Sequence, residues 1–438
     1  MPPTPARRRS LPLAPPARRG LPLLDESREI DRVWRPSYVV WEVTLACDLA
    51  CHHCGSRAGR ARPDELSTAE ALDLVDQLAA LGANEVTLIG GEAYLRDDWT
   101  QLIARIAHHK MRCGMATGGR GLTLDRVKAA RDAGLTAISV SVDGLEGEHD
   151  AQRGLHGSFA SAMAAMDHVR AAGGIRLTAN SQINRVSLPV VEQLFEAIAE
   201  RGAKAWQVQL TAAMGRAADE PRIFLDPYEV LEVLPRLARL KREGERRGVM
   251  LWPGNNVGYF GPFEGVIRGD YATGYRGACG AGRMSLGIEA NGDVKGCPSL
   301  PSDAYVGGNV REHPLVDLWE RSRPLRFTRD LAVHDLKGFC ATCYYAHECR
   351  GGCHWTSHVL LGERGDNPFC HHRALELLRE GVRERVRCVE AAPGLPFDHA
   401  RYEVYREPWP ASERAAIERL HAEVEAETCG PFTNADAR

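Results

Sequence analysis

The chain has 438 residues, of which 44% are hydrophobic and 26% are charged, and its formal net charge is −3. This composition is typical of folded globular proteins, and the length favours two or more compact units. The small net charge argues against a nucleic-acid-binding protein, and the lack of an apolar run of about 18 residues argues against a membrane-spanning one.

Residues 1–36 are predicted to form a disordered or extended arm, because the segment begins with a stretch rich in Pro, Arg and Ala. From about Ser37 onward, strands and helices alternate. The strand candidates are 37–45, 85–90, 111–117, 136–144, 175–183 and 203–210, and the helix candidates are 67–82, 97–109, 123–134, 157–172, 188–202 and 226–247. This α/β pattern predicts parallel βα units that close into a partial (β/α)6 barrel over residues 37–255, with ligands at the carboxyl ends of the strands.

Glycines, turns and cysteines become dense in the next part of the chain, and the helices there are short. We therefore expect a small cysteine-rich domain over residues 256–375. A helical extension over 376–438 is expected to follow, with helices at 374–390 and 411–428. Segment 392–410 is turn-rich and aromatic and carries no functional prediction.

Cysteine is the unusual feature of the composition, with 13 residues and no secretory signal. The cytoplasm keeps protein thiols reduced, so clustered cysteines in a cytoplasmic protein favour metal binding. Cys47, Cys51 and Cys54 have C-x3-C-x2-C spacing directly after the first predicted strand. Three thiolates suit an iron–sulfur cluster and leave one iron open to a small molecule. The alternative is a structural zinc site that uses His52 or His53 as its fourth ligand.

This spacing at a strand end resembles that of the radical S-adenosylmethionine (SAM) superfamily. The resemblance implies a 4Fe–4S cluster whose open iron binds the amino and carboxylate groups of SAM. An electron from the cluster then cleaves the sulfonium and yields a 5′-deoxyadenosyl radical. The resemblance also implies that Gly90, Gly91 and Glu92 bind the SAM amine, with Ala93 in place of the usual proline. Glycine at this strand end lets backbone approach the ligand closely.

Further SAM contacts are implied for polar residues near later strand ends. The candidates are Ser141 and Asp143 near the ribose, Arg153 and Asn180 for the carboxylate and ribose, and Gln207 with Gln209 along the adenine or substrate cavity. His53 is expected to pack over the adenine. For Arg153, Asn180 and the two glutamines an ordinary structural role is equally compatible with the sequence, and no catalytic acid or base is predicted.

Seven more cysteines lie in the predicted cysteine-rich domain, enough for one cluster with four protein ligands and one with three. They resemble the SPASM domain of radical SAM enzymes, which carries two auxiliary 4Fe–4S clusters. That resemblance implies a first auxiliary site at Cys279, Cys297 and Cys353, and a second at Cys340, Cys343, Cys349 and Cys370. The first site lacks a fourth cysteine, so it is either open or completed by another side chain or by substrate. The alternative is a pair of zinc ribbons. Cys113, Cys388 and Cys429 are expected to be ordinary thiols.

The two resemblances together imply an oxidoreductase with three 4Fe–4S clusters and SAM that removes a hydrogen atom from a ribosomally synthesised peptide. The implied product carries a thioether or carbon–carbon crosslink or another oxidation, and flavodoxin or ferredoxin is the implied electron donor. Formylglycine formation, as in sulfatase maturation, is an alternative that Pro298 disfavours, because an acidic residue follows the preceding cysteine in that family. Oxidation of a small molecule or cofactor precursor is a further alternative, and a non-catalytic iron–sulfur or zinc protein is the last.

Overall fold

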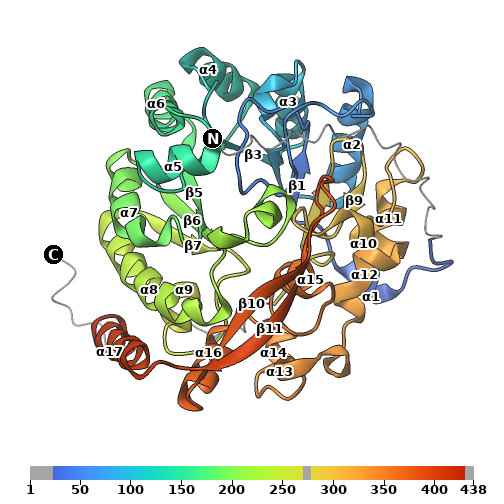
Figure 1. The fold of residues 1–438 in the computed structure, drawn as a ribbon. Helices are drawn as coiled ribbons and strands as arrows, with labels where there is room; N and C mark the ends of the chain where they lie inside the picture. Colours follow the sequence, from blue (N-terminus) through green and yellow to red (C-terminus); the bar gives the residue numbers. More distant parts are fainter. Residues whose placement is uncertain (1–22, 270–277, 430–438) are drawn as a thin grey trace, which may run out of the picture.

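The computed structural model describes residues 23–269 and 278–429, and its centre is a curved sheet (Figure 1). The nine strands have the order β7-β6-β5-β4-β3-β2-β1-β8-β9, and all neighbours are parallel except β8 and β9. The strands are β1 (Tyr38–Glu42), β2 (Glu85–Ile89), β3 (Arg112–Thr117), β4 (Ala137–Ser141), β5 (Arg176–Ile183), β6 (Ala205–Leu210), β7 (Met250–Pro253), β8 (Ser285–Ile288) and β9 (Val294–Lys295). The predicted barrel is confirmed, and β7, β8 and β9 extend it at both edges.

Helices follow the barrel strands along the outer side of the sheet (Figure 1). Those of the barrel region are α1 (Glu29–Val33), α2 (Thr68–Leu81), α3 (Trp99–His108), α4 (Leu124–Ala133), α5 (Glu146–Arg153), α6 (Ser158–Ala172), α7 (Val191–Glu200), α8 (Val230–Arg247) and α9 (Glu264–Arg268). Those of the later region are α10 (Ser302–Tyr305), α11 (Leu315–Arg321), α12 (Arg323–Asp330), α13 (Gly338–Ala341), α14 (Ala346–Cys349), α15 (His354–Leu361), α16 (His371–Arg379) and α17 (Ala411–Thr428). No helix of the described residues is both long and apolar enough to cross a bilayer.

Local sequence signals set the ends of the predicted helices. Ser67 caps α2 by accepting a hydrogen bond from the Glu70 amide, and the Glu70 side chain accepts one from the Ser67 amide in return. Gly82 ends this helix in the left-handed conformation, with φ of 88°. Thr123 caps α4 by accepting a hydrogen bond from the Arg126 amide, and Gly134 ends this helix in the left-handed conformation.

The two faces of the barrel sheet differ in polarity. Residues such as Val140, Ala179 and Val208 are buried in the apolar core that the sheet forms with its helices. The alternate residues, such as the half-buried Asn180 and the exposed Gln207, are polar. Because side chains alternate along a strand, one face supplies the core and the other is free to meet a ligand.

The prediction of a helix over 374–390 is confirmed as far as Arg379, the end of α16, and is wrong beyond it. Gly381, with φ of 77°, follows α16, and the chain continues as β10 (Val382–Glu390), which pairs antiparallel with β11 (Arg401–Pro408). Pairing with β11 decides the strand, because the segment mixes charged residues with Val382, Val386 and Cys388 and has no regular alternation of burial. As far as Cys429, where the described residues end, the hairpin is followed by α17, which packs on α8.

The N-terminal arm is partly folded. Residues 1–22 of the predicted arm lie outside the described residues. Within the described part, α1 places Asp31 in full burial, where its carboxylate pairs with Arg326 at 2.9 Å and Arg329 at 3.3 Å. Residues from about Glu29 are therefore anchored to α12 rather than extended, because these buried ion pairs hold them there.

Candidate active site

The first cysteine loop, residues 46–59, follows β1 at the carboxyl edge of the barrel. Its two ends meet in a bridge between Ala46 and Gly59. Arg216, just beyond β6, braces the loop: its amide donates to the Cys54 carbonyl at 3.0 Å, and its Nε donates to the Cys51 carbonyl at 2.7 Å. Sequence reasoning missed Arg216, for which the only signal was its place after a strand end.

The three thiols of this loop lie close enough to influence one another. The pKa of Cys47 is raised to about 12, mainly by burial and also by negative charge on Glu92, Cys51 and Cys54. The Arg153 guanidinium donates to the Cys51 sulfur at 3.6 Å. One buried and two partly buried thiols that repel one another when ionised favour a bound cation that shares their charge, so this donor set fits an iron–sulfur cluster.

Gly90 and Gly91 let the end of β2 pack against the first cysteine loop. A Cβ on Gly91 would lie 1.9 Å from the Ala46 carbonyl oxygen, and one on Gly90 would lie 2.1 Å from that of Thr44. The amides of Gly91 and Glu92 donate to these same two oxygens, each at 2.8 Å. Glycine at these two positions is therefore required by the approach of the strand end to the backbone at Thr44 and Ala46, while contact with SAM stays a prediction.

Glu92 is a buried carboxylate beside this loop, with 2% of its surface exposed. It accepts hydrogen bonds from the Thr117 hydroxyl at 2.5 Å and the Gly118 amide at 2.6 Å. Its oxygen and the donor atoms of Cys47 and Asp48 lie within 4.8 Å of one another. Burial raises the pKa of Glu92 to about 7, so the site favours a cationic partner that restores the charged form.

Asp143 and Arg153 pair with each other at the first cysteine loop. Asp143 is fully buried and accepts from Arg153 Nη2 at 2.5 Å and from the Gln182 amide at 2.8 Å. His53 Nε2 lies 3.2 Å from the same carboxylate. Burial alone raises the pKa of Asp143, but the charges of Arg153 and His53 outweigh burial and hold it well below its usual range. These side chains form a network that ends at Cys51.

Ser141, Asn180 and Gln207 lie in one row across β4, β5 and β6. The strand register pairs Ser141 with Asn180 and Asn180 with Gln207. All three are on the polar face of the sheet, and the Asn180 amide donates to Ser139 Oγ at 3.3 Å. The row offers hydroxyl and amide groups to a polar ligand.

The seven cysteines of the second field fall into two groups, and the thiols within each group interact electrostatically. Burial raises the pKa values of the thiols in both groups. One group is Cys279, Cys297 and Cys353, and the other is Cys340, Cys343, Cys349 and Cys370. Tyr259 lies between the groups: its hydroxyl accepts from the Cys353 amide at 2.8 Å, and its carbonyl accepts from the Cys370 thiol at 3.8 Å. The groups match the two expected auxiliary sites in membership, while ligation itself stays a prediction.

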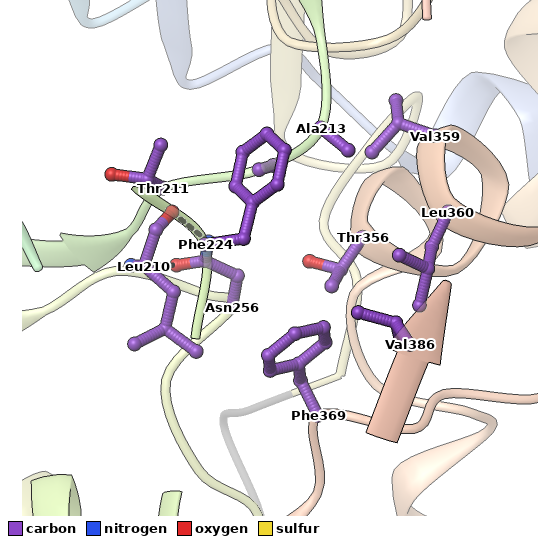
Figure 2. A pocket seen from close by; sticks show the side chains of 11 residues that line it. Leu210, Thr211, Ala213, Phe224, Asn256, Thr356, Val359, Leu360, Phe369 and Val386 are labelled. Carbon is purple, nitrogen blue, oxygen red and sulfur yellow. Dashed lines mark hydrogen bonds between the residues drawn. The ribbon is translucent and has the colours of Figure 1, made fainter. Parts of the chain in front are cut away.

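A small apolar pocket lies beyond the end of β6, between this strand, α15 and β10 (Figure 2). Phe224, Val359 and Phe369 line it, and it has room for only about one water molecule. The nearby Asn256 side chain hydrogen-bonds the Leu210 backbone. The pocket is a packing gap and is too small for a substrate.

Two protein-family models match segments of the chain. A model described as "Radical SAM superfamily" matches residues 41–201, and one described as "Iron-sulfur cluster-binding domain", SPASM, matches residues 279–344. An AdoMet-dependent heme synthase of Nitratidesulfovibrio vulgaris is 29% identical, over 76% of this chain and 92% of that protein. The mycofactocin maturase MftC of Mycobacterium ulcerans is 32% identical, over 73% and 83%. The PqqA peptide cyclase of Rhizobium meliloti is 26% identical, over 83% and 92%.

A solved structure has a similar fold. Streptococcus suis SuiB bound to S-adenosylmethionine superposes with a TM-score of 0.58 and 16% identity, over 73% of each chain.

Proposed function

Because the chain belongs to the radical SAM superfamily and carries a SPASM domain, we propose that it modifies a ribosomally synthesised peptide by radical chemistry. Its cofactors are SAM and 4Fe–4S clusters. The product is a thioether or carbon–carbon crosslink or another oxidation of the peptide. We further propose that the enzyme is cytoplasmic and receives electrons from flavodoxin or ferredoxin, with the barrel at residues 37–255 and the cluster domain at 256–375.

The observation that carries this proposal is the pairing of a three-thiol loop with a buried carboxylate. Cys47, Cys51 and Cys54 supply three ligands, one fewer than a closed cluster uses, and Glu92 lies beside them. The cluster and SAM, when bound, supply a 5′-deoxyadenosyl radical that removes a hydrogen atom from the substrate. Glu92 is suited to accept hydrogen bonds from the SAM ammonium.

Other residues of the chain support this site. Arg153 donates to the Cys51 sulfur and so stabilises a thiolate there. Asp143 orients Arg153 through the 2.5 Å contact. We propose that the row of Ser141, Asn180 and Gln207 binds the polar part of SAM or of the substrate.

We assign the second field to two auxiliary clusters. Cys279, Cys297 and Cys353 would hold one with a ligand position left over, and Cys340, Cys343, Cys349 and Cys370 would hold the other. The peptide substrate is supported by the relatives, one of which is a peptide cyclase and another a mycofactocin maturase.

The test starts with anaerobic reconstitution of the full chain. With SAM and dithionite, we expect 5′-deoxyadenosine, and none from the variant with Cys47, Cys51 and Cys54 all changed to Ala. Co-expression with a short peptide encoded near the gene should give a peptide whose mass has fallen by two hydrogens for each crosslink. Zinc in place of iron and sulfide in the purified protein would contradict the proposal.

A second candidate is the oxidation of a cofactor precursor, favoured by the relatives that are AdoMet-dependent heme synthases. The same enzyme preparation distinguishes the two. Heme formed from a porphyrin precursor, with no change in any candidate peptide, would support the second function and exclude the first.

A further inference from the structure

The β10–β11 hairpin follows α16, and the connection between its strands contacts the first cysteine loop (Figure 1). We define the hairpin tip as residues 391–400, which connect the two strands. Most of the tip belongs to the turn-rich segment 392–410, which carries no functional prediction. Its contacts link the first cysteine loop to the second cysteine field.

On one side, the hairpin tip is bound to the first cysteine loop and to the chain after β6. Arg57, three residues after Cys54, donates to Asp398 Oδ1 at 2.8 Å. The Phe397 amide donates to the Gly55 carbonyl at 3.2 Å, and the Gly215 amide donates to the Asp398 carbonyl at 2.8 Å. Backbone and side chain of the tip therefore both hold the loop.

Hydrogen bonds within the hairpin tip orient the Asp398 side chain toward the loop. Its side chain is 6% exposed, and Oδ2 accepts hydrogen bonds from the amides of Gly394 and Leu395 at 2.5 and 2.8 Å. Arg57 is likewise fixed, because its other nitrogens bind Asp219 at 2.6 and 2.8 Å. The contact thus joins two groups whose orientations are already set.

On its other side, the hairpin tip meets the second cysteine field. The Phe397 ring lies 3.8 Å from the ammonium of Lys295, which is fully buried and two residues before Cys297. The same ring belongs to an apolar cluster with Trp355, two residues after Cys353. One aromatic side chain of the tip therefore meets Lys295 and the cluster of Trp355, each two positions in the sequence from a cysteine of the proposed first auxiliary site.

We propose that the hairpin tip is a positioning element that sets the first cysteine loop relative to the first auxiliary site, with Asp398 as the positioning residue. This inference rests on the proposed function, because only bound clusters give that separation a chemical meaning. A substrate that reacts with the radical at one site and with the auxiliary cluster at the other needs a constant distance between them.

Asp398→Asn tests this contact in the reconstituted full chain. The amide side chain still accepts from the turn backbone but loses its charge toward Arg57. We expect the Phe397 and Gly215 amides to exchange hydrogen about tenfold faster or more. We also expect a change in the dipolar broadening that the neighbouring cluster imposes on the EPR signal of the first cluster.

Two further variants make the result specific. Asp398→Glu keeps the charge and should restore part of both signals. Glu403→Gln removes the exposed hairpin ion pair with Arg387, at 2.9 Å, and should leave both unchanged. Two results for Asp398→Asn would overturn the positioning role in an enzyme that still cleaves SAM. One is amide exchange as slow as in the wild type, and the other is faster amide exchange with unchanged dipolar broadening of the EPR signal. Absence of iron would instead overturn the proposed function.

Discussion

Replacing Asp143 with Asn should destabilise the barrel strongly. Asp143 is fully buried, and its carboxylate binds the Arg153 guanidinium at 2.5 Å. The substitution keeps the shape of the side chain but leaves the Arg153 charge without its buried partner. Breaking a buried ion pair on one side costs about 3–5 kcal/mol of folding free energy.

The pH dependence of the wild type follows from the same contact. The folded pKa of Asp143 is well below its unfolded value of about 3.9. Its contribution to the free energy of unfolding is therefore fully present above pH 4 and is lost as the pH falls toward the folded pKa. The variant lacks this contribution, so the difference between the two proteins should shrink in acid.

Urea unfolding of the metal-free protein, followed by circular dichroism, measures the effect. Asp132→Asn is the matched control: Asp132 pairs with Arg131 at a similar 2.8 Å, but its side chain is 66% exposed. An exposed pair contributes at most about 1 kcal/mol. Equal losses in the two variants, or a larger loss in the control, would refute the argument from burial.

Three more outcomes are expected. Glu92→Gln should weaken SAM binding about 10–100-fold. In equilibrium dialysis, the affinity of the wild type for SAM should rise with pH through about 7, because burial raises the pKa of Glu92 to about 7. The affinity of the variant should show no such rise. Gly91→Ala should lose the iron of the first site, because the new Cβ would lie 1.9 Å from a carbonyl oxygen of the first cysteine loop. Gly147→Ala is the control, with open space around its Cβ. Its free energy of unfolding in urea should rise by up to about 1 kcal/mol. Changing Cys340 and Cys343 to Ala should remove the iron of one auxiliary cluster, by metal analysis, and spare SAM cleavage; unchanged iron would contradict the assignment.

The sequence was sufficient for the barrel because each strand and helix carries its own signals. The alternation in β5 and the cap residues of α2 are local features, and the structure confirms both elements. The hairpin was not predictable in this way. The segment 382–390 has charged residues compatible with a helix, and only its pairing with β11 makes it a strand.

The site shows the same division between local and distant information. Cys47, Cys51 and Cys54 are spaced within one loop, so their pattern is visible in the sequence. The groups that surround them are not, because Arg216 follows β6 and Asp398 belongs to the hairpin tip. The sequence placed these residues in no motif, and only the fold brings them to the loop.

The first cysteine loop is held mainly by hydrogen bonds from separate parts of the chain. Arg153 comes from α5, Arg216 from beyond β6 and Glu92 from the end of β2, and parallel strands bring these positions to one edge. No residue of the loop belongs to the apolar core of the barrel, so under the proposed function a bound cluster would add to the order of the loop. Removing iron should therefore speed amide exchange in residues 46–59 while the apolar core of the barrel keeps its protection, because that core packs against the outer helices and not against the loop.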